Sequence, residues 1–118
     1  MDSKSYAILI LMGLPVLGTV LARKNHEVLA QRIVMNYSFQ GLARSEAESY
    51  LSSRLKTCGV HQPIFQDNAI EAIFAASNGS VRHLNTIASK ALLLAAQKNE
   101  RMITADLIMA VRDDMALV

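Results

Sequence analysis

The residues best placed for chemistry lie around a turn in the second half of the chain. Asn78-Gly79 is typical of a helix end, because glycine readily takes the left-handed conformation that terminates a helix. Ser80 is expected to be the N-cap of the next helix, with Arg82 in its first turn. The helix dipole disfavours a cation there by about 0.3–1 kcal/mol and favours an anion. Arg82 is therefore either a solvated cation or a side chain that reaches for a phosphate.

The composition restricts the class of protein. A length of 118 residues suits one domain or part of one, and 52% apolar with 19% charged residues favours a packed core over disorder. The net charge of +2 is too small to indicate nucleic-acid binding by itself. One cysteine, Cys58, excludes an intrachain disulfide and favours a reducing compartment. The histidines lack metal-ligand spacing, so we expect no metal site; they are His26, His61 and His83.

The uncharged run Ala7–Ala22 is the first feature of the N-terminal part. Its sixteen residues are short for a membrane span, which needs about 20. Lys4 before the run leaves a signal peptide or anchor as an alternative, although Asp2 counts against it. The continuously apolar segment Ala7–Met12 is typical of a strand buried on both faces of a parallel sheet.

Glycines follow this segment in a spacing that mimics a phosphate-binding loop. Gly13 and Gly18-Thr19 fit that pattern, but the lysine that would precede the threonine is absent, so we reject the match. Pro15 instead predicts a helix that runs to about Lys24, and Asn25–Gln31 a second short helix.

A polar–apolar alternation marks Ile33–Gln40, directly after Gln31-Arg32. Period two with one polar face predicts a half-exposed strand, often at a sheet edge. Two strands with helix between them look like part of an α/β sheet, but they are too few to be a whole one.

The chain after Gly41 is expected to be helical. Four segments each have a cap signal and an apolar face. They begin at a capping box over Ser45–Glu48, at Asp67, at Ser80 and at Thr104, and the third runs to about Lys98. The predicted fold is mainly α: a four-helix unit from about 42 to 116, preceded by a partial α/β remnant with two strands. The expected domains are residues 1–41 and 42–118.

This order of elements resembles the C-terminal half of an AAA+ ATPase of the ExeA-like, general secretion pathway A type, which includes transposon-associated relatives. Four stretches carry the resemblance: Ile8–Pro15, Leu29–Ile33, Gln40–Leu42, and Gly79–Arg82 with Leu84-Asn85. The resemblance implies two strands of an incomplete P-loop sheet followed by a helical lid.

The resemblance also implies roles for single residues. Arg32 matches the arginine finger that acts in trans, and Arg82, with Gly79 and Ser80, matches the second sensor of the nucleotide. Ala7–Met12 matches the first-sensor strand, where Leu14 replaces the usual polar residue. An arginine fork suits the charge on transferring phosphoryl oxygens, and a finger contributes roughly 10³–10⁵ in rate. The alternative for Arg32 is an ordinary exposed cation before an edge strand.

The motifs that hold ATP are missing from the chain. It has no G-x-x-x-x-G-K-[ST] and no strand that ends in Asp-Glu. The resemblance therefore implies a longer cytoplasmic protein that binds ATP and Mg through residues upstream of Met1, while this chain alone binds neither and is inactive. We expect self-association, and transposase and DNA as further partners of the longer protein, with no membrane in this segment.

The implied function is that of a transposition accessory ATPase. The alternatives are an ATPase of a secretion pathway, a helical module that binds protein or DNA without nucleotide, and a small secreted or anchored helical protein.

Overall fold

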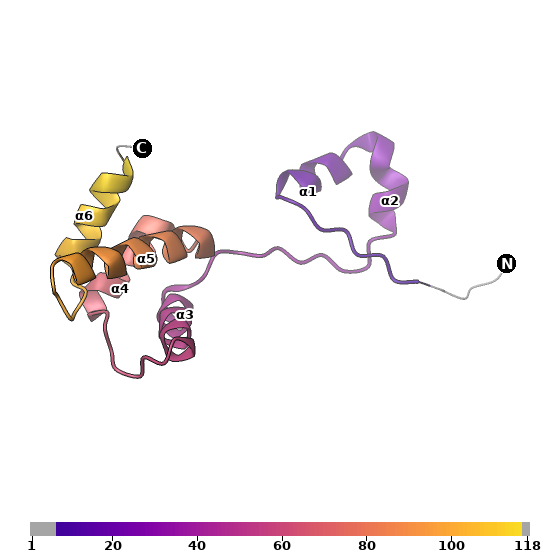
Figure 1. Ribbon diagram of the computed structural model, residues 1–118. Coiled ribbons are helices and arrows are strands. Elements are labelled where there is room, and N and C mark those ends of the chain that lie inside the picture. The colour runs from indigo at the N-terminus through magenta and orange to yellow at the C-terminus, as the bar shows by residue number, and fades with distance from the viewer. Residues whose placement is uncertain (1–6, 117–118) are drawn as a thin grey trace. The chain divides into compact units, whose positions relative to one another are not determined.

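The computed structural model describes residues 7–116, and these form helices joined by loops (Figure 1). The predicted mainly α class is confirmed. The chain divides into two units, Met1–Phe39 and Gln40–Val118. The second unit begins two residues before Leu42, where the expected second domain begins. The elements in order are α1 Val16–Leu21, η1 Lys24–His26, α2 Glu27–Gln31, α3 Arg44–Thr57, α4 Asp67–Ser77, α5 Val81–Gln97 and α6 Ala105–Ala116.

The first unit contains the short elements α1, η1 and α2. Pro15 is the N-cap of α1, as its fixed φ and missing N–H favour. The helix predicted from Pro15 ends earlier than expected, at Leu21, and the one predicted over Asn25–Gln31 divides into η1 and α2. None of the residues in these elements is buried, so the unit has no core of its own among its described residues.

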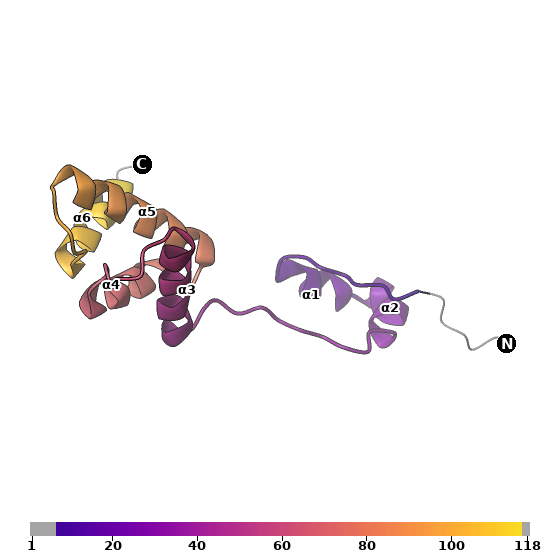
Figure 2. The ribbon, with the colours of Figure 1, turned by 60° about the horizontal axis from the view of Figure 1, so that its bottom comes forward.

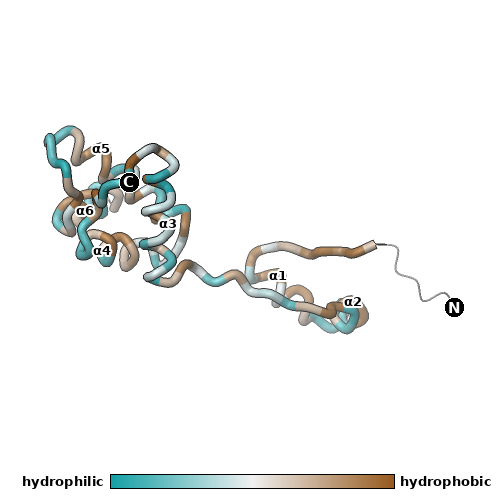
Figure 3. Tube along the Cα trace, turned by 90° about the horizontal axis from the view of Figure 1, so that it is seen from below, coloured by the Kyte–Doolittle hydropathy of each residue, from teal (hydrophilic) through white to brown (hydrophobic). Residues whose placement is uncertain are grey.

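The two strands predicted for this unit do not form. Residues 7–14 and 33–43 lie outside any helix or strand, and Figure 3 shows the segment that leads into α1 as strongly apolar. Ile8 is 92% exposed and Val34 98% exposed. A strand exists only through backbone pairing with neighbours, and an apolar pattern alone supplies no neighbour. Within residues 7–116 the one recorded β-pairing is an isolated parallel bridge between Phe65 and Ile103, in the second unit.

The second unit is the four-helix assembly that the sequence predicts. Helices α4, α5 and α6 pack against one another, and α3 packs against α4 (Figure 2). Helical spacing of apolar residues places one face of each helix in a shared core. The buried members of this core are Ala47, Leu51, Phe65, Ala69, Ile70, Ile73, Leu84, Ile87, Ala88, Ala91, Ala95, Ile103, Leu107, Ile108 and Val111.

Short backbone contacts connect the loop before α4 with the loop before α6. The Ile103 N–H donates to the Ile64 carbonyl at 2.9 Å, and the Gln66 N–H donates to the Ile103 carbonyl at 3.0 Å. Thr104 then caps α6 as predicted, because its hydroxyl accepts from the Leu107 N–H at 3.4 Å. Helix α4 begins at Asp67, whose predicted role as a cap is taken by Gln66.

The capping box predicted for α3 is wrong by two residues. The N-cap is Ala43, and Glu46 rather than Glu48 reaches back, accepting from the Ala43 N–H at 2.7 Å. Alanine has no side-chain oxygen, so only this half of a capping box forms. The chain enters α3 from Leu42, which is held by a contact with the α4–α5 turn. We attribute the position of the helix start to this tertiary contact. It joins residues far apart in the sequence, so the local capping pattern could not predict it.

Candidate functional site

The turn between α4 and α5 positions the candidate site. Asn78 and Gly79 both have positive φ, 51° and 76°, so two successive left-handed residues end α4. The buried Ser77 hydroxyl donates to the Phe74 carbonyl at 3.1 Å and accepts from the Gly79 N–H at 3.3 Å. The Ser80 N–H donates to the Ser77 carbonyl at 3.0 Å. The predicted helix end is confirmed, and its hydrogen bonds fix the path of the chain into α5.

A close backbone crossing ties this turn to the entry of α3. The Leu42 N–H donates to the Gly79 carbonyl at 2.8 Å. A Cβ on Gly79 would lie 2.6 Å from the Leu42 carbonyl oxygen, and one on Gly41 would lie 3.0 Å from the Gly79 oxygen. Gly79 is therefore required for the approach, and a side chain at Gly41 would make the Gly79 backbone shift by a few tenths of an ångström. The sequence marks Gly41 only as a boundary; its contact with Gly79 becomes visible in the fold.

Ser80 and Arg82 lie at the start of α5, as predicted. Ser80 is the N-cap by backbone geometry, and its carbonyl accepts from the Leu84 N–H at 2.9 Å, but its hydroxyl makes no cap hydrogen bond. Arg82 is exposed, and its carbonyl accepts from the Thr86 hydroxyl at 2.9 Å. The Arg82 guanidinium has no ion-pair or hydrogen-bond partner among residues 7–116. The site thus offers a free cationic fork at a fixed helix start.

Polar groups of α3 lie beside the next turn of α5. The Tyr50 hydroxyl donates to the Asn85 side-chain oxygen at 2.9 Å. Asn85 is three residues after Arg82, so both project from one side of the helix. Tyr50 also lines a shallow groove of about 470 Å³ along α3. Its other lining residues are Leu42, Ser45, Glu46, Ser49 and Ser53. Tyr50 has no local sequence signal, because its partner lies 35 residues away.

Arg32, the candidate finger, belongs to the first unit. It is the C-cap of α2, and its backbone N–H donates to the Leu29 carbonyl at 3.0 Å. Its side chain is exposed and forms no hydrogen bond or ion pair with the part of the chain that the structure describes. The structure thus brings Gly79, Ser80 and Arg82 together in the second unit, while Arg32 stands in the first.

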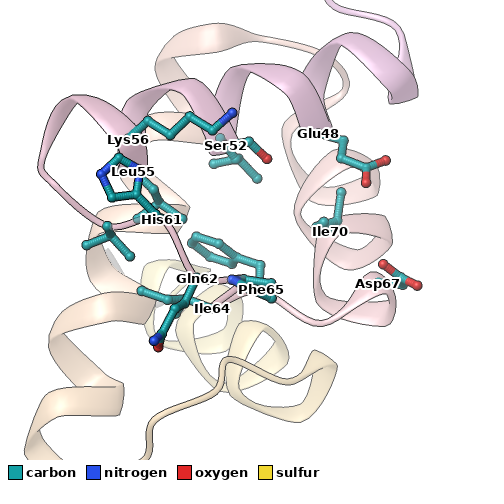
Figure 4. Close-up of a pocket in the computed structure, with 13 residues that line it drawn as sticks. Glu48, Ser52, Leu55, Lys56, His61, Gln62, Ile64, Phe65, Asp67 and Ile70 are labelled. Atoms are coloured by element: carbon teal, nitrogen blue, oxygen red, sulfur yellow. The ribbon is translucent and has the colours of Figure 1, made fainter.

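A separate hollow of about 260 Å³ lies between α3, the loop after it and α4 (Figure 4). Leu51, Phe65 and Ile70 contribute apolar surface to it, while Figure 4 shows Lys56 and His61 toward one end and Glu48 and Asp67 toward the other. None of the residues predicted for the site lines it. Sequence inspection missed this hollow because its walls come from three segments that meet only in the fold.

Arg44 forms one ion pair within α3, with Glu48, and one between α3 and α4, with Glu71. Its guanidinium binds Glu71 and Glu48, the latter at 2.6 Å. Hydrogen bonds to Glu71 and then Glu48 raise the pKa of Arg44 above its ordinary value. Because the side chain is on the surface, this network orients two helices and adds little stability.

The residues present fit one contact to a phosphate and do not fit a complete ATP·Mg site. Arg82 can donate to phosphate oxygens. The glycine-rich loop with lysine is absent from the sequence, and residues 7–116 contain no cluster of His, Cys, Asp or Glu that could hold a metal. In the same range, no helix has the length and apolarity that crossing a membrane requires.

The chain is similar to General secretion pathway protein A of Aeromonas hydrophila. The two are 31% identical over 110 residues, which are 92% of this chain and 20% of that protein. The chain thus spans about a fifth of the relative's length. No family model matches the chain, and no solved structure matches it. The similarity supports the relationship to the general secretion pathway A type that the sequence motifs predict.

Proposed function

We propose that this chain is the arginine-finger and lid portion of an AAA+ ATPase related to General secretion pathway protein A. The second unit is the lid, and Arg82 senses the nucleotide. The observation that carries this proposal is the free guanidinium of Arg82 at a helix start fixed by the Gly41–Gly79 crossing. The similarity over nearly the whole chain supports it.

A fixed helix start matters for sensing. If Arg82 were on a flexible loop, it could follow a phosphate without moving anything else. The backbone crossing ties the start of α5 to the entry of α3. Phosphate binding by Arg82 is therefore coupled to the position of the whole second unit. Binding or loss of the terminal phosphate then becomes a change in lid orientation.

The rest of the catalytic site belongs to other parts of the longer protein. ATP and Mg are bound by residues outside this chain, and Arg32 acts in trans on the nucleotide of a neighbouring subunit. Residues 7–12 and 33–39 become strands when the remaining strands of the sheet are present to pair with them. The chain alone therefore neither binds ATP nor hydrolyses it.

Two settings fit this activity. The resemblance implies a transposition accessory ATPase with transposase and DNA as partners, whereas the printed name of the similar protein supports a secretion pathway. The genes beside this one distinguish them: a neighbouring transposase gene supports transposition, and neighbouring secretion genes support secretion.

The second candidate is a helical module that binds a partner without nucleotide. The hollow between α3 and α4 favours this class, because it combines an apolar floor with charged ends and contains no nucleotide-sensing residue. Arginine substitutions at the α5 start would leave such a module unaffected.

A fusion protein tests the proposal. The portion of General secretion pathway protein A that precedes the matched stretch would be joined to this chain, and ATP hydrolysis measured. We expect hydrolysis by the fusion and none by the chain alone. Arg32→Ala should abolish turnover, Arg23→Ala in the same unit should not, and subunits altered in the phosphate-loop lysine should partly rescue Arg32→Ala in mixtures. A folded fusion that does not hydrolyse ATP would contradict the proposal.

A further inference from the structure

The hollow between α3, the loop after it and α4 has a size that suits one or two large side chains. Its volume is about 260 Å³, below the roughly 300–1,000 Å³ typical of pockets for small molecules and cofactors. Leu51, Phe65 and Ile70 supply apolar walls. A large side chain that fills a pocket of this kind is a common anchor of a protein or peptide partner. The hollow therefore suits a peptide better than a cofactor.

Charges of opposite sign flank the hollow. Figure 4 shows Lys56 toward one end and Glu48 and Asp67 toward the other. The side chains of Lys56 and Asp67 form no ion pair or hydrogen bond with residues 7–116. Glu48 shares Arg44 with Glu71, so this end keeps more negative than positive charge. A complementary partner carries an acidic residue at the first end and a basic residue at the second.

The separation of these charges matches an extended peptide. Lys56 follows Glu48 by eight residues in α3, which is about 12 Å along a helix. In an extended segment the first and fifth residues lie about 13 Å apart, and the first, third and fifth side chains share one face. Five residues with charges of opposite sign at the ends and a large apolar residue in the middle therefore span the hollow.

Phe65 offers the backbone groups that an extended partner needs. Its bridge to Ile103 uses the carbonyl of Ile64 and the N–H of Gln66. The N–H and carbonyl of Phe65 itself lie on the edge away from Ile103, and neither forms a hydrogen bond with residues 7–116. Figure 4 shows Phe65 across the hollow from Ser52 of α3. A peptide that adds along this edge would pair with both groups, as in recognition by strand addition.

We propose that the hollow binds an extended segment of a partner protein that has an acidic, a large apolar and a basic residue at alternate positions. The apolar side chain enters the hollow, the acidic residue pairs with Lys56, and the basic residue pairs with Asp67 and Glu48. One residue of the partner exchanges backbone hydrogen bonds with Phe65. Arg82 does not line the hollow, so this inference does not rest on nucleotide sensing.

An NMR titration of the isotope-labelled whole chain tests the site. The probes are acetyl-Glu-Thr-Leu-Thr-Lys-amide and the peptide of reversed sequence, because either order can place the glutamate beside Lys56. We expect at least one probe to bind saturably and to shift the amide signals of Phe65 and of other residues around the hollow. Serine in place of the leucine should weaken binding at least tenfold, because the anchor is lost.

Three outcomes of this titration would overturn the proposal. The first is that neither probe binds. The second is that the largest shifts lie outside the hollow. The third is that signals around the hollow shift with protein concentration when no peptide is present, which would identify a second copy of the chain as the occupant.

Two phenylalanine substitutions on α3 test whether the peptide enters the hollow. Ser52 lines the hollow, whereas its neighbour Ser53 lines the separate groove beside Tyr50, and both serines are exposed. Ser52→Phe should fill the hollow and weaken peptide binding at least tenfold. Ser53→Phe adds the same side chain to the same helix and should change binding less than twofold. An equal effect of the two substitutions would contradict the proposed position of the peptide.

A charge reversal tests the pairing with Lys56. Lys56→Glu should weaken binding of the glutamate probe at least threefold and strengthen binding of acetyl-Lys-Thr-Leu-Thr-Lys-amide. The control Arg54→Glu changes the net charge equally at an exposed residue of α3 that does not line the hollow. It should change the binding of either peptide less than twofold. If Arg54→Glu acts like Lys56→Glu, or the lysine peptide gains nothing from Lys56→Glu, the proposed pairing is wrong.

Discussion

Gly79 has two properties that together only glycine accommodates: a φ of +76°, and a Cβ position 2.6 Å from the Leu42 carbonyl oxygen. The first makes any L side chain strained, and the second leaves no room for it. Gly41 approaches the same turn from the other side. These two glycines, rather than any contact of the Arg82 side chain, fix the backbone position of the helix start from which Arg82 projects.

Two alanine substitutions separate strain from crowding. Gly59→Ala has the same strain, with φ +85° and open space around the new Cβ, and should cost about 1–2 kcal/mol. Gly79→Ala should cost at least about 1 kcal/mol more, because the backbone at Leu42 must also move. Urea unfolding of both variants measures the difference. Equal losses of stability would show that the crossing is easily displaced.

At the scale of elements, α5 connects the core and the site. Its one face is buried throughout, while its first turn presents Arg82 to solvent. The helix is therefore held by packing at residues that take no part in the proposed sensing, so stability and function can be altered separately.

Two leucines of α5 test this division. Leu84 is fully buried, and Leu84→Ala should reduce the free energy of unfolding by about 2–5 kcal/mol. Leu93, 66% exposed, is the control, and Leu93→Ala should change it by less than about 0.5 kcal/mol. Thermal unfolding followed by circular dichroism measures both. Similar melting temperatures for the two variants would contradict the observed packing.

Helices were predictable here, and strands were not, for one reason. The apolar spacing of α5 and the cap at Thr104 act within a few residues, so they can be recognised in the sequence. The pairing of residues 7–12 and 33–39 depends on partners elsewhere, and the start of α3 depends on the Gly79 turn. The Tyr50–Asn85 bond and the hollow beside α3 likewise join distant segments. Sequence inspection therefore predicted the helix end at Gly79 and the helix start at Ser80, next to Arg82, but not the contacts around them.

At the scale of the whole molecule, the second unit has the only buried core among the described residues. A polypeptide of residues 40–118 should therefore fold by itself, because it retains that core and the Gly41–Gly79 crossing. We expect a cooperative thermal transition within a few degrees of that of the full chain, measured by circular dichroism. A broad, non-cooperative transition would show that the first unit contributes to the core.

The central claim is that Arg82 senses a nucleotide. Its most direct test is the affinity of the fusion protein for ATP, with Arg82→Ala compared with Arg112→Ala, an exposed arginine of α6. A charge-assisted hydrogen bond contributes about 1.5–3 kcal/mol, so Arg82→Ala should raise the dissociation constant for ATP at least tenfold. Arg112→Ala should leave it within twofold. An unchanged affinity in Arg82→Ala, or an equal loss in both variants, would contradict the claim.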